Sequence, residues 1–131
     1  MTNLLVVEDH PIFAGVLLEA LAKRDDLHVV QVVGSAEEVL LVIPGLNIDL
    51  ILVDVSLPKM NGIDLVGKLM QMDPNVLCLV ISGHLSDLYL RRSLAAGARG
   101  YAIKDSAKDI IEGIYQVMRG EIYICKELRT P

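Results

Sequence analysis

The sequence predicts an α/β fold in which a parallel sheet is covered by helices on both faces. First, short runs rich in Val, Ile and Leu alternate with segments of helical spacing. Second, 53% of the residues are hydrophobic and only 4% are aromatic, which is typical of the aliphatic strands of a parallel sheet. Third, 131 residues are most simply one domain, long enough to build a real core.

Five apolar runs are expected to form the strands, because each is short and bounded by polar or turn residues. They are NLLVV (3–7), LHVVQVV (27–33), IDLILV (48–53), NVLCLVI (75–81) and GYAI (100–103). A helical segment follows each run, so the pattern predicts five βα units, written (βα)5, in a doubly wound parallel sheet with right-handed crossovers. The last residues, 121–131, show no further strong helix or strand.

Two of the helical segments show clear apolar faces. The expected faces are Ile12, Val16, Leu17, Ala20 and Leu21 in 11–24, and Ile110, Ile111, Ile114, Val117 and Met118 in 107–119. Pro11 stands where the first turn of a helix tolerates proline, and Ser35 is an expected N-cap with Glu38 three residues on. Gly97 and Gly120 are expected to end the helices that precede them.

The composition excludes several classes. A net charge of -5 argues against nucleic-acid binding by this segment, because phosphate contacts need clustered Lys and Arg. Cys78 and Cys125 are isolated, so we expect reduced thiols. No secretory signal pattern begins the chain, and no stretch approaches the ~20 apolar residues of a membrane helix. We therefore expect a cytoplasmic protein with no membrane partner.

Acidic residues stand where two of the predicted strands end. Glu8 and Asp9 follow the first strand, and Asp54 follows the third. The carboxyl ends of parallel strands open on one edge of the sheet, where ligands bind. Carboxylates gathered there repel one another, so that one pKa rises or a divalent cation binds. Mg²⁺ is the expected cation, because it prefers hard oxygen ligands and needs few of them from the protein.

A hydroxyl and an ammonium group complete this edge. Ser82 follows the fourth strand and Lys104 lies just beyond the fifth. A carboxylate beside Mg²⁺, a hydroxyl and an ammonium indicates phosphoryl transfer through an aspartyl-phosphate. Asp54 is the expected nucleophile, because its strand is the most uniformly apolar and therefore central. A zinc site is not expected, because the histidines lie on different elements without ligand-like spacing: His10, His28 and His84.

Four stretches carry a family resemblance: VVEDHPIF, LVDVSLPKMNGIDL, VISGH and GARGYAIKD. They resemble the receiver domain of response regulators in two-component systems, in the branch that usually carries a C-terminal helix-turn-helix DNA-binding domain. The similarity extends from about Asn3 to about Glu121, which is nearly the whole chain. It implies a flavodoxin-like five-stranded sheet with strand order 2-1-3-4-5.

The resemblance also implies roles for individual residues. Asp54 is then the phosphoacceptor and Asp9 a direct Mg²⁺ ligand, while Glu8 acts through water and the backbone carbonyl of Ser56 supplies a further metal ligand. The remaining roles concern the phosphoryl group: a hydrogen bond from Ser82, an ion pair with Lys104, and a rotamer change of Tyr101 with phosphorylation state. Taken alone, Ser82 also fits turn chemistry, and Tyr101 also fits half-buried packing.

The expected function is a signalling switch rather than an enzyme, because the domain would catalyse only its own phosphorylation and dephosphorylation. The phosphodonor would be a sensor histidine kinase or a small acyl phosphate, and the output would be transcription through a helix-turn-helix domain that these residues do not contain. We expect the receiver domain in 1–121 and the start of an interdomain linker in 122–131. A homodimer is compatible with the resemblance, although the sequence indicates no interface for one.

Two other classes remain open at this point. A phosphohydrolase of the haloacid dehalogenase kind also forms an aspartyl-phosphate, but it requires an Asp two residues after the nucleophile, where this chain has Ser56. A flavodoxin-like module that binds nucleotide or flavin requires backbone N–H groups in the loop after the first strand, where EDHPIF offers acids and a proline.

Overall fold

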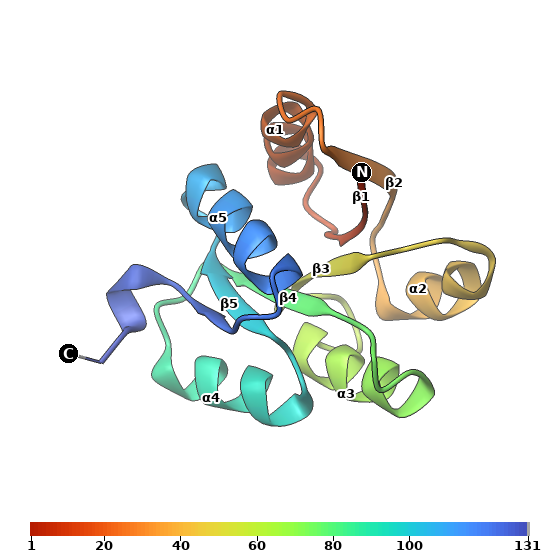
Figure 1. Cartoon of the computed structure of the whole chain (residues 1–131). Helices are drawn as coiled ribbons and strands as arrows, with labels where there is room; N and C mark the ends of the chain where they lie inside the picture. The colour runs from red at the N-terminus through yellow and green to blue at the C-terminus, as the bar shows by residue number, and fades with distance from the viewer. Residues whose placement is uncertain (131) are drawn as a thin grey trace.

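The expected strands and helices all form, and they alternate along the chain in the computed structural model, which describes residues 1–130 (Figure 1). The first five strands are β1 (Thr2–Val7), β2 (Leu27–Val33), β3 (Leu50–Asp54), β4 (Cys78–Ser82) and β5 (Gly100–Ile103). The helices are α1 (Pro11–Ala22), α2 (Ala36–Val42), α3 (Gly62–Met72), α4 (Asp87–Ala96) and α5 (Ala107–Met118), and two short 3₁₀ helices lie at Ile43–Gly45 and Lys126–Leu128. The strands are parallel in the order β2-β1-β3-β4-β5, which confirms the predicted topology.

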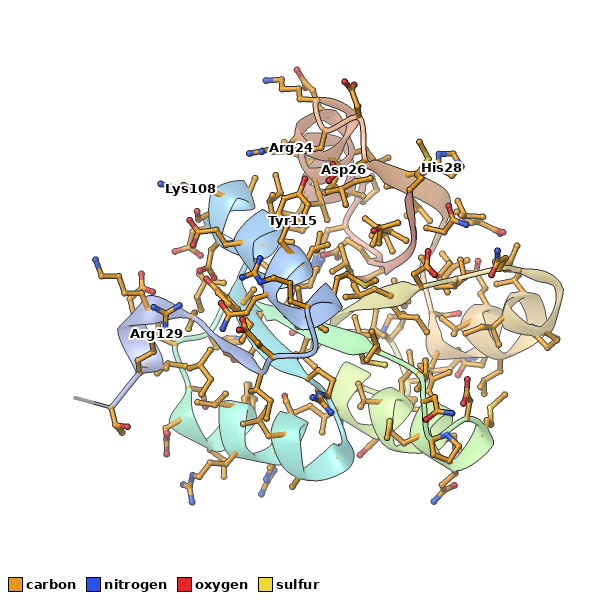
Figure 2. The ribbon with its side chains drawn as sticks, in the orientation of Figure 1. Arg24, Asp26, His28, Lys108, Tyr115 and Arg129 are labelled. Atoms are coloured by element: carbon orange, nitrogen blue, oxygen red, sulfur yellow. The ribbon has the colours of Figure 1, made fainter. Side chains whose placement is uncertain are left out.

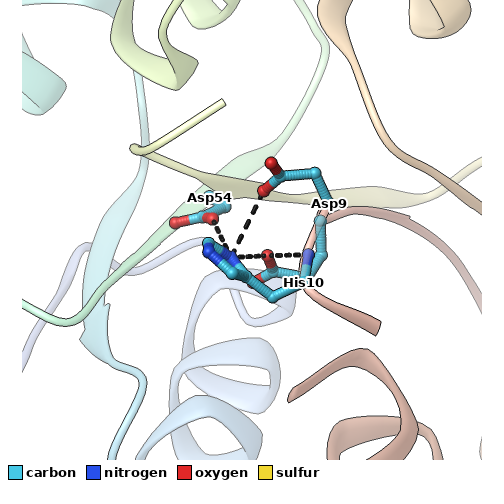
Figure 3. Close-up of side chains that lie close together, drawn as sticks. Asp9, His10 and Asp54 are labelled. Carbon is cyan, nitrogen blue, oxygen red and sulfur yellow. Dashed lines mark hydrogen bonds and ion pairs between the residues drawn. The ribbon is translucent and has the colours of Figure 1, made fainter. Parts of the chain in front are cut away.

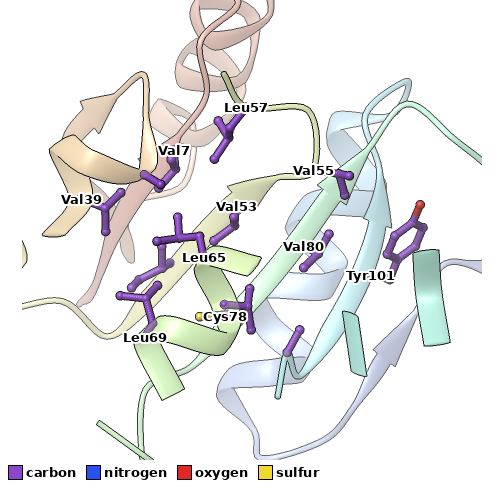
Figure 4. Close-up of a cluster of buried hydrophobic side chains, with 14 of the residues drawn as sticks. Val7, Val39, Val53, Val55, Leu57, Leu65, Leu69, Cys78, Val80 and Tyr101 are labelled. Atoms are coloured by element: carbon purple, nitrogen blue, oxygen red, sulfur yellow. The ribbon is translucent and has the colours of Figure 1, made fainter. Parts of the chain in front are cut away.

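Two layers of helices bury the sheet: α1 and α5 on one face, and α2, α3 and α4 on the other (Figure 1). Side chains alternate between the two cores along each central strand. In β3, Leu50 and Leu52 pack toward α1 and α5, whereas Ile51 and Val53 pack on the other side with Leu65 of α3 (Figure 4). Because helices cover both faces of the sheet, all residues of β3 are buried, including Asp54 at its end.

Several helix ends match their sequence signals. The Ser35 hydroxyl accepts a hydrogen bond from the backbone N–H of Glu38 at 3.2 Å and so caps α2. Pro11 is the first residue of α1. Gly97 ends α4 with φ of 113°, in the left-handed region that other residues rarely adopt.

The apolar face predicted for α1 was wrong in part. Leu17 and Leu21 are buried in the core, but Ile12 is 86% exposed and Val16 is 55% exposed. Ile12 and Leu21 are nine residues apart, or about two and a half turns, so they lie on opposite sides of the helix. Glu19 is the one charged residue of α1, and it lies on the exposed side together with Ile12 and Val16, so the apolar residues alone did not select the side that meets the sheet.

A sixth strand, β6 (Tyr123–Ile124), corrects the expectation that 121–131 forms no further element. It pairs in parallel with the outer edge of β5, where the N–H of Tyr123 donates to the carbonyl of Arg99 at 3.0 Å and the N–H of Cys125 to that of Tyr101 at 2.9 Å. The Tyr123 side chain is buried against the α5 side of the sheet. Two residues are too few for a periodic pattern, so this strand was not detectable from sequence.

The last turn of α5 is also hydrogen-bonded to the chain beside β2, at the opposite edge of the sheet from β6. The hydroxyl of Tyr115 donates a hydrogen bond to Asp26 Oδ1 at 2.8 Å, which ties α5 to the turn before β2 (Figure 2).

Both cysteines, Cys78 and Cys125, are free and buried, as expected. Within residues 1–130, none of the helices has the length and apolarity needed to cross a membrane.

Candidate functional site

Three acidic side chains meet at the carboxyl edge of the sheet, where β1 and β3 end side by side. Val7 pairs with Val53, so Glu8 and Asp9 emerge next to Asp54. One oxygen from each of the three carboxylates, together with one nitrogen of His10, lies within 4.8 Å of the others. Figure 3 shows the carboxylates of Asp9 and Asp54 both facing the His10 ring. The acids that the sequence separates by more than forty positions therefore form one cluster.

Lys104 reaches this cluster from the loop after β5. Its Nζ lies 2.6 Å from Glu8 Oε1 and donates a hydrogen bond to Asp54 Oδ2 at 3.2 Å. The Lys104 side chain is 15% exposed, whereas those of Glu8 and Asp54 are 0% and 1% exposed. The contact with Glu8 Oε1 lacks hydrogen-bond alignment, so it is an ion pair alone. One ammonium thus faces two buried carboxylates.

The charges of this cluster are unequally compensated. Burial opposes ionisation of Glu8, but the contact with Lys104 and the hydrogen bonds from His10 outweigh it and hold the pKa of Glu8 below its usual range. Burial, together with the negative charge of Glu8, raises the pKa of Asp54 above its ordinary value. Burial likewise opposes the charge of Lys104, yet its contacts with Glu8 and Asp54 outweigh that effect and raise the pKa of Lys104. An added cation would therefore favour the ionised form of Asp54.

The Asp54 carboxylate is held in place by its own loop. The N–H of Ser56 donates to Asp54 Oδ1 at 3.2 Å, while Oδ2 faces Lys104. Ser56 itself is exposed, two residues beyond the end of the strand. The start of α3 lies directly behind, because Gly62 donates its N–H to the carbonyl of Val55 at 2.9 Å. These contacts fix both carboxylate oxygens relative to the sheet.

Ser82 and Tyr101 lie on the next two strands and are both tied to His84. Ser82 is fully buried at the end of β4, and its hydroxyl accepts from the N–H of His84 at 3.0 Å. Tyr101 is fully buried in the core beside α4 (Figure 4), and its hydroxyl donates to the carbonyl of His84 at 2.7 Å. Neither side chain makes a hydrogen bond to Asp54 in the described residues.

Loss of the shared ammonium should cost stability. We expect Lys104→Ala to lower the free energy of unfolding by roughly 3 kcal/mol in EDTA, because breaking a buried ion pair leaves carboxylates uncompensated. Excess Mg²⁺ should restore part of this loss, because the cation relieves the same repulsion. Urea denaturation followed by circular dichroism, with EDTA or Mg²⁺, measures both effects.

Lys68, which is exposed on α3, provides the matched control. Lys68→Ala should change the stability by no more than about 0.5 kcal/mol, with or without Mg²⁺. Equal stability of Lys104→Ala and the parent chain in EDTA would show that the ammonium does not stabilise the two carboxylates.

Comparison with known proteins identifies the family. The family model of the response regulator receiver domain matches residues 4–115, which is most of the chain. The chain belongs to the response regulator receiver family. This membership makes it a phosphoacceptor signalling domain of the two-component type, and it favours the receiver over the phosphohydrolase and flavin-binding alternatives.

Curated relatives of this receiver domain are transcriptional regulators. It is 32% identical to the transcriptional regulatory protein DegU of Brevibacillus brevis over 123 residues, covering 93% of the chain and 52% of DegU. It is 33% identical to the DNA-binding transcriptional activator DevR/DosR of Mycobacterium tuberculosis, covering 80% of the chain and 48% of that protein. The receiver domain thus spans about half the length of these two relatives.

Solved structures agree on the fold. A LuxR-family two-component response regulator from Aurantimonas superimposes with a TM-score of 0.93 at 23% identity, over 98% of this chain and 93% of that one. The signal receiver domain of the response regulator NarL from Mycobacterium tuberculosis superimposes with a TM-score of 0.84 at 25% identity, over 92% of this chain and 98% of that one.

Sequence reasoning on this receiver domain overlooked one side chain. His10 was set aside because the three histidines lie on different elements, yet its ring stands among the acids of the cluster. The hydrogen bond to Glu8 and the charge of Asp9 raise the pKa of the His10 imidazole. The position of His10 could have been inferred, because it directly follows Glu8 and Asp9 in the loop at the carboxyl end of a parallel strand.

Proposed function

We propose that Asp54 is the phosphoacceptor of this receiver domain. The observation that carries the proposal is a buried carboxylate at the end of the central strand, 3.2 Å from the ammonium of Lys104 and beside a second acidic pair. A nucleophile requires a carboxylate at the edge of the sheet, and a positive charge nearby to compensate the incoming phosphoryl group.

The acidic cluster fits a divalent cation, because three carboxylates converge within 4.8 Å and two of them are buried. Asp9 and Asp54 would hold Mg²⁺ directly, Glu8 would act through water, and the backbone carbonyl of Ser56 would supply a further ligand. Bound Mg²⁺ supplies charge neutralisation for the acidic cluster and for the phosphoryl oxygens. Asp9, whose side chain is 33% exposed, is the most accessible of the three carboxylates.

The switch that we propose begins with Lys104, which would move from its contacts with Asp54 to the phosphoryl group. Ser82 would turn its hydroxyl from the N–H of His84 to a phosphoryl oxygen, and Tyr101 would follow through its own bond to His84. Because Ser82 and Tyr101 share this one partner, a shift at His84 links the site to the surface formed by α4, β5 and α5.

For the whole protein we propose a transcriptional response regulator. The relatives named above are transcriptional regulators, and each is about twice as long as the share that this chain matches. A helix-turn-helix DNA-binding domain would follow residue 131, and a sensor histidine kinase would be the phosphodonor. Because β6 joins the sheet and Cys125 is buried, we place the end of the receiver near Cys125 rather than at 121, and the linker to the output domain after it.

Intact-mass spectrometry after incubation with acetyl phosphate tests the proposal. With Mg²⁺ the chain should gain one phosphoryl group, because the cation and Lys104 compensate the charge that arrives at Asp54. With EDTA it should gain none. A phosphoryl gain of equal size in EDTA would contradict the metal requirement, and failure to gain phosphoryl from both acetyl phosphate and an active histidine kinase would overturn the function.

The proposed metal ligand has its own test. We expect Asp9→Ala to weaken Mg²⁺ binding by about tenfold or more, because the substitution removes a carboxylate ligand of the cation. Isothermal titration calorimetry measures the dissociation constant. Asp25→Ala removes an exposed acid from the turn before β2 and should leave the constant unchanged. An unchanged Mg²⁺ affinity of Asp9→Ala would exclude Asp9 as a ligand.

A further inference from the structure

One imidazole nitrogen of His10 faces every carboxylate of the acidic cluster. His10 Nδ1 lies 3.0 Å from Glu8 Oε2, 3.3 Å from Asp9 Oδ1 and 3.8 Å from Asp54 Oδ2 (Figure 3). Lys104 approaches from the loop after β5 and pairs with the other oxygen of Glu8, Oε1. The two oxygens of Glu8 are thus divided between an ammonium and an imidazole.

The backbone holds the ring of His10 in this position. His10 precedes Pro11, which disfavours helical backbone at the preceding residue, and its φ of -91° and ψ of 107° are extended. Its N–H donates to Glu8 Oε2 at 3.0 Å. His10 stands at the N-cap position of α1, but its side chain makes no capping hydrogen bond. The imidazole therefore contacts the acidic cluster and does not cap α1.

This donor set differs from one made of oxygen alone. Mg²⁺ prefers hard oxygen ligands and water, whereas an imidazole nitrogen favours borderline cations such as Co²⁺ and Zn²⁺. We propose that His10 Nδ1 releases to solvent the proton that it directs at Glu8 and becomes a ligand of the cation that the acidic cluster binds, and that it shifts the preference of the site from Mg²⁺ toward borderline divalent cations. This inference rests on the proposed function, because the cation is the one expected beside Asp54.

The consequence is a selectivity that depends on one side chain. Removal of the ring takes away the nitrogen ligand that strengthens Co²⁺ binding, and it leaves the oxygen ligands that bind Mg²⁺. His10→Gln should therefore weaken Co²⁺ binding by about tenfold or more, while the Mg²⁺ affinity changes by less than about twofold. The change in the ratio of the two affinities is diagnostic, since oxygen sites also bind Co²⁺ more tightly than they bind Mg²⁺.

The experiment titrates the parent chain and His10→Gln with MgCl₂ and with CoCl₂ by calorimetry. His28→Gln is the matched control, because His28 is exposed on β2, away from the carboxyl edge of the sheet. Electron spin-echo spectroscopy of the Mn²⁺-loaded chain adds a direct readout, namely modulation from a coordinated imidazole nitrogen. That modulation should be present in the parent chain and in His28→Gln, and absent in His10→Gln. Circular dichroism confirms that the variants are folded.

The possible outcomes distinguish the ligand role of His10 from the proposed function. An unchanged Co²⁺ to Mg²⁺ ratio in His10→Gln, or no nitrogen modulation in the parent chain, overturns the role of His10 and leaves the proposed function standing. Absence of any cation binding overturns both. Nitrogen modulation that depends on His10, in a chain that acetyl phosphate and kinase fail to phosphorylate, supports the ligand and overturns the proposed function.

Discussion

The Asp54→Asn variant is expected to gain no phosphoryl group from acetyl phosphate and Mg²⁺, under conditions in which the parent chain gains one. A neutral amide cannot act as the nucleophile that a carboxylate provides. The substitution is nearly isosteric, and its side-chain oxygen can still accept from the N–H of Ser56. The measurement is intact-mass spectrometry of the two proteins side by side.

The same variant should remain folded. Burial and the charge of Glu8 raise the pKa of Asp54, so a neutral side chain suits the position, and Lys104 keeps Glu8 as its partner at 2.6 Å. We therefore expect a free energy of unfolding equal to or above that of the parent chain. Asp73→Asn, an exposed acid at the end of α3, is the control that should still accept one phosphoryl group. Phosphoryl incorporation by Asp54→Asn would place the acceptor elsewhere.

The second large effect concerns the glycine behind the phosphoacceptor. A Cβ atom at Gly62 would lie 2.0 Å from the backbone oxygen of Asp54 and 2.9 Å from Val53 Cγ1. The backbone of β3 cannot yield, because it pairs with β1 and β4 on both sides. We expect Gly62→Ala to lower the free energy of unfolding by about 3 kcal/mol or more, at the upper end of overpacking costs. Displacement of Asp54 should also slow phosphorylation.

Gly67 on the same helix is the matched control, because a Cβ atom there would meet nothing within 4 Å. Gly67→Ala should stabilise the chain by about 0.5–1 kcal/mol, because alanine loses less backbone entropy than glycine in a helix. Urea denaturation measures both variants. If Gly62→Ala unfolded at the same urea concentration as the parent chain, the close approach of α3 to Asp54 would not constrain the site.

Much of the fold could be predicted because local signals agreed with one another. The bounds of β2 and β5 match the apolar runs 27–33 and 100–103 residue for residue. The run 48–53 predicted β3 less well, because the strand begins at Leu50 and includes the buried Asp54. A strand that is buried on both faces lacks the alternation of polar and apolar residues, so its ends depend on pairing with neighbouring strands.

The chain order of strands, helices and acids was determined by the sequence alone. Apolar runs, helix caps and the residues that follow each run are local features, and parallel pairing brings Glu8, Asp9 and Asp54 to one edge whatever the remaining contacts are. Tertiary structure decided which surfaces meet. The buried side of α1, the pairing of β6 with β5, and the positions of His10 and Lys104 around Glu8 depend on contacts between elements. Such contacts follow from packing in three dimensions, and no periodicity within a single element encodes them.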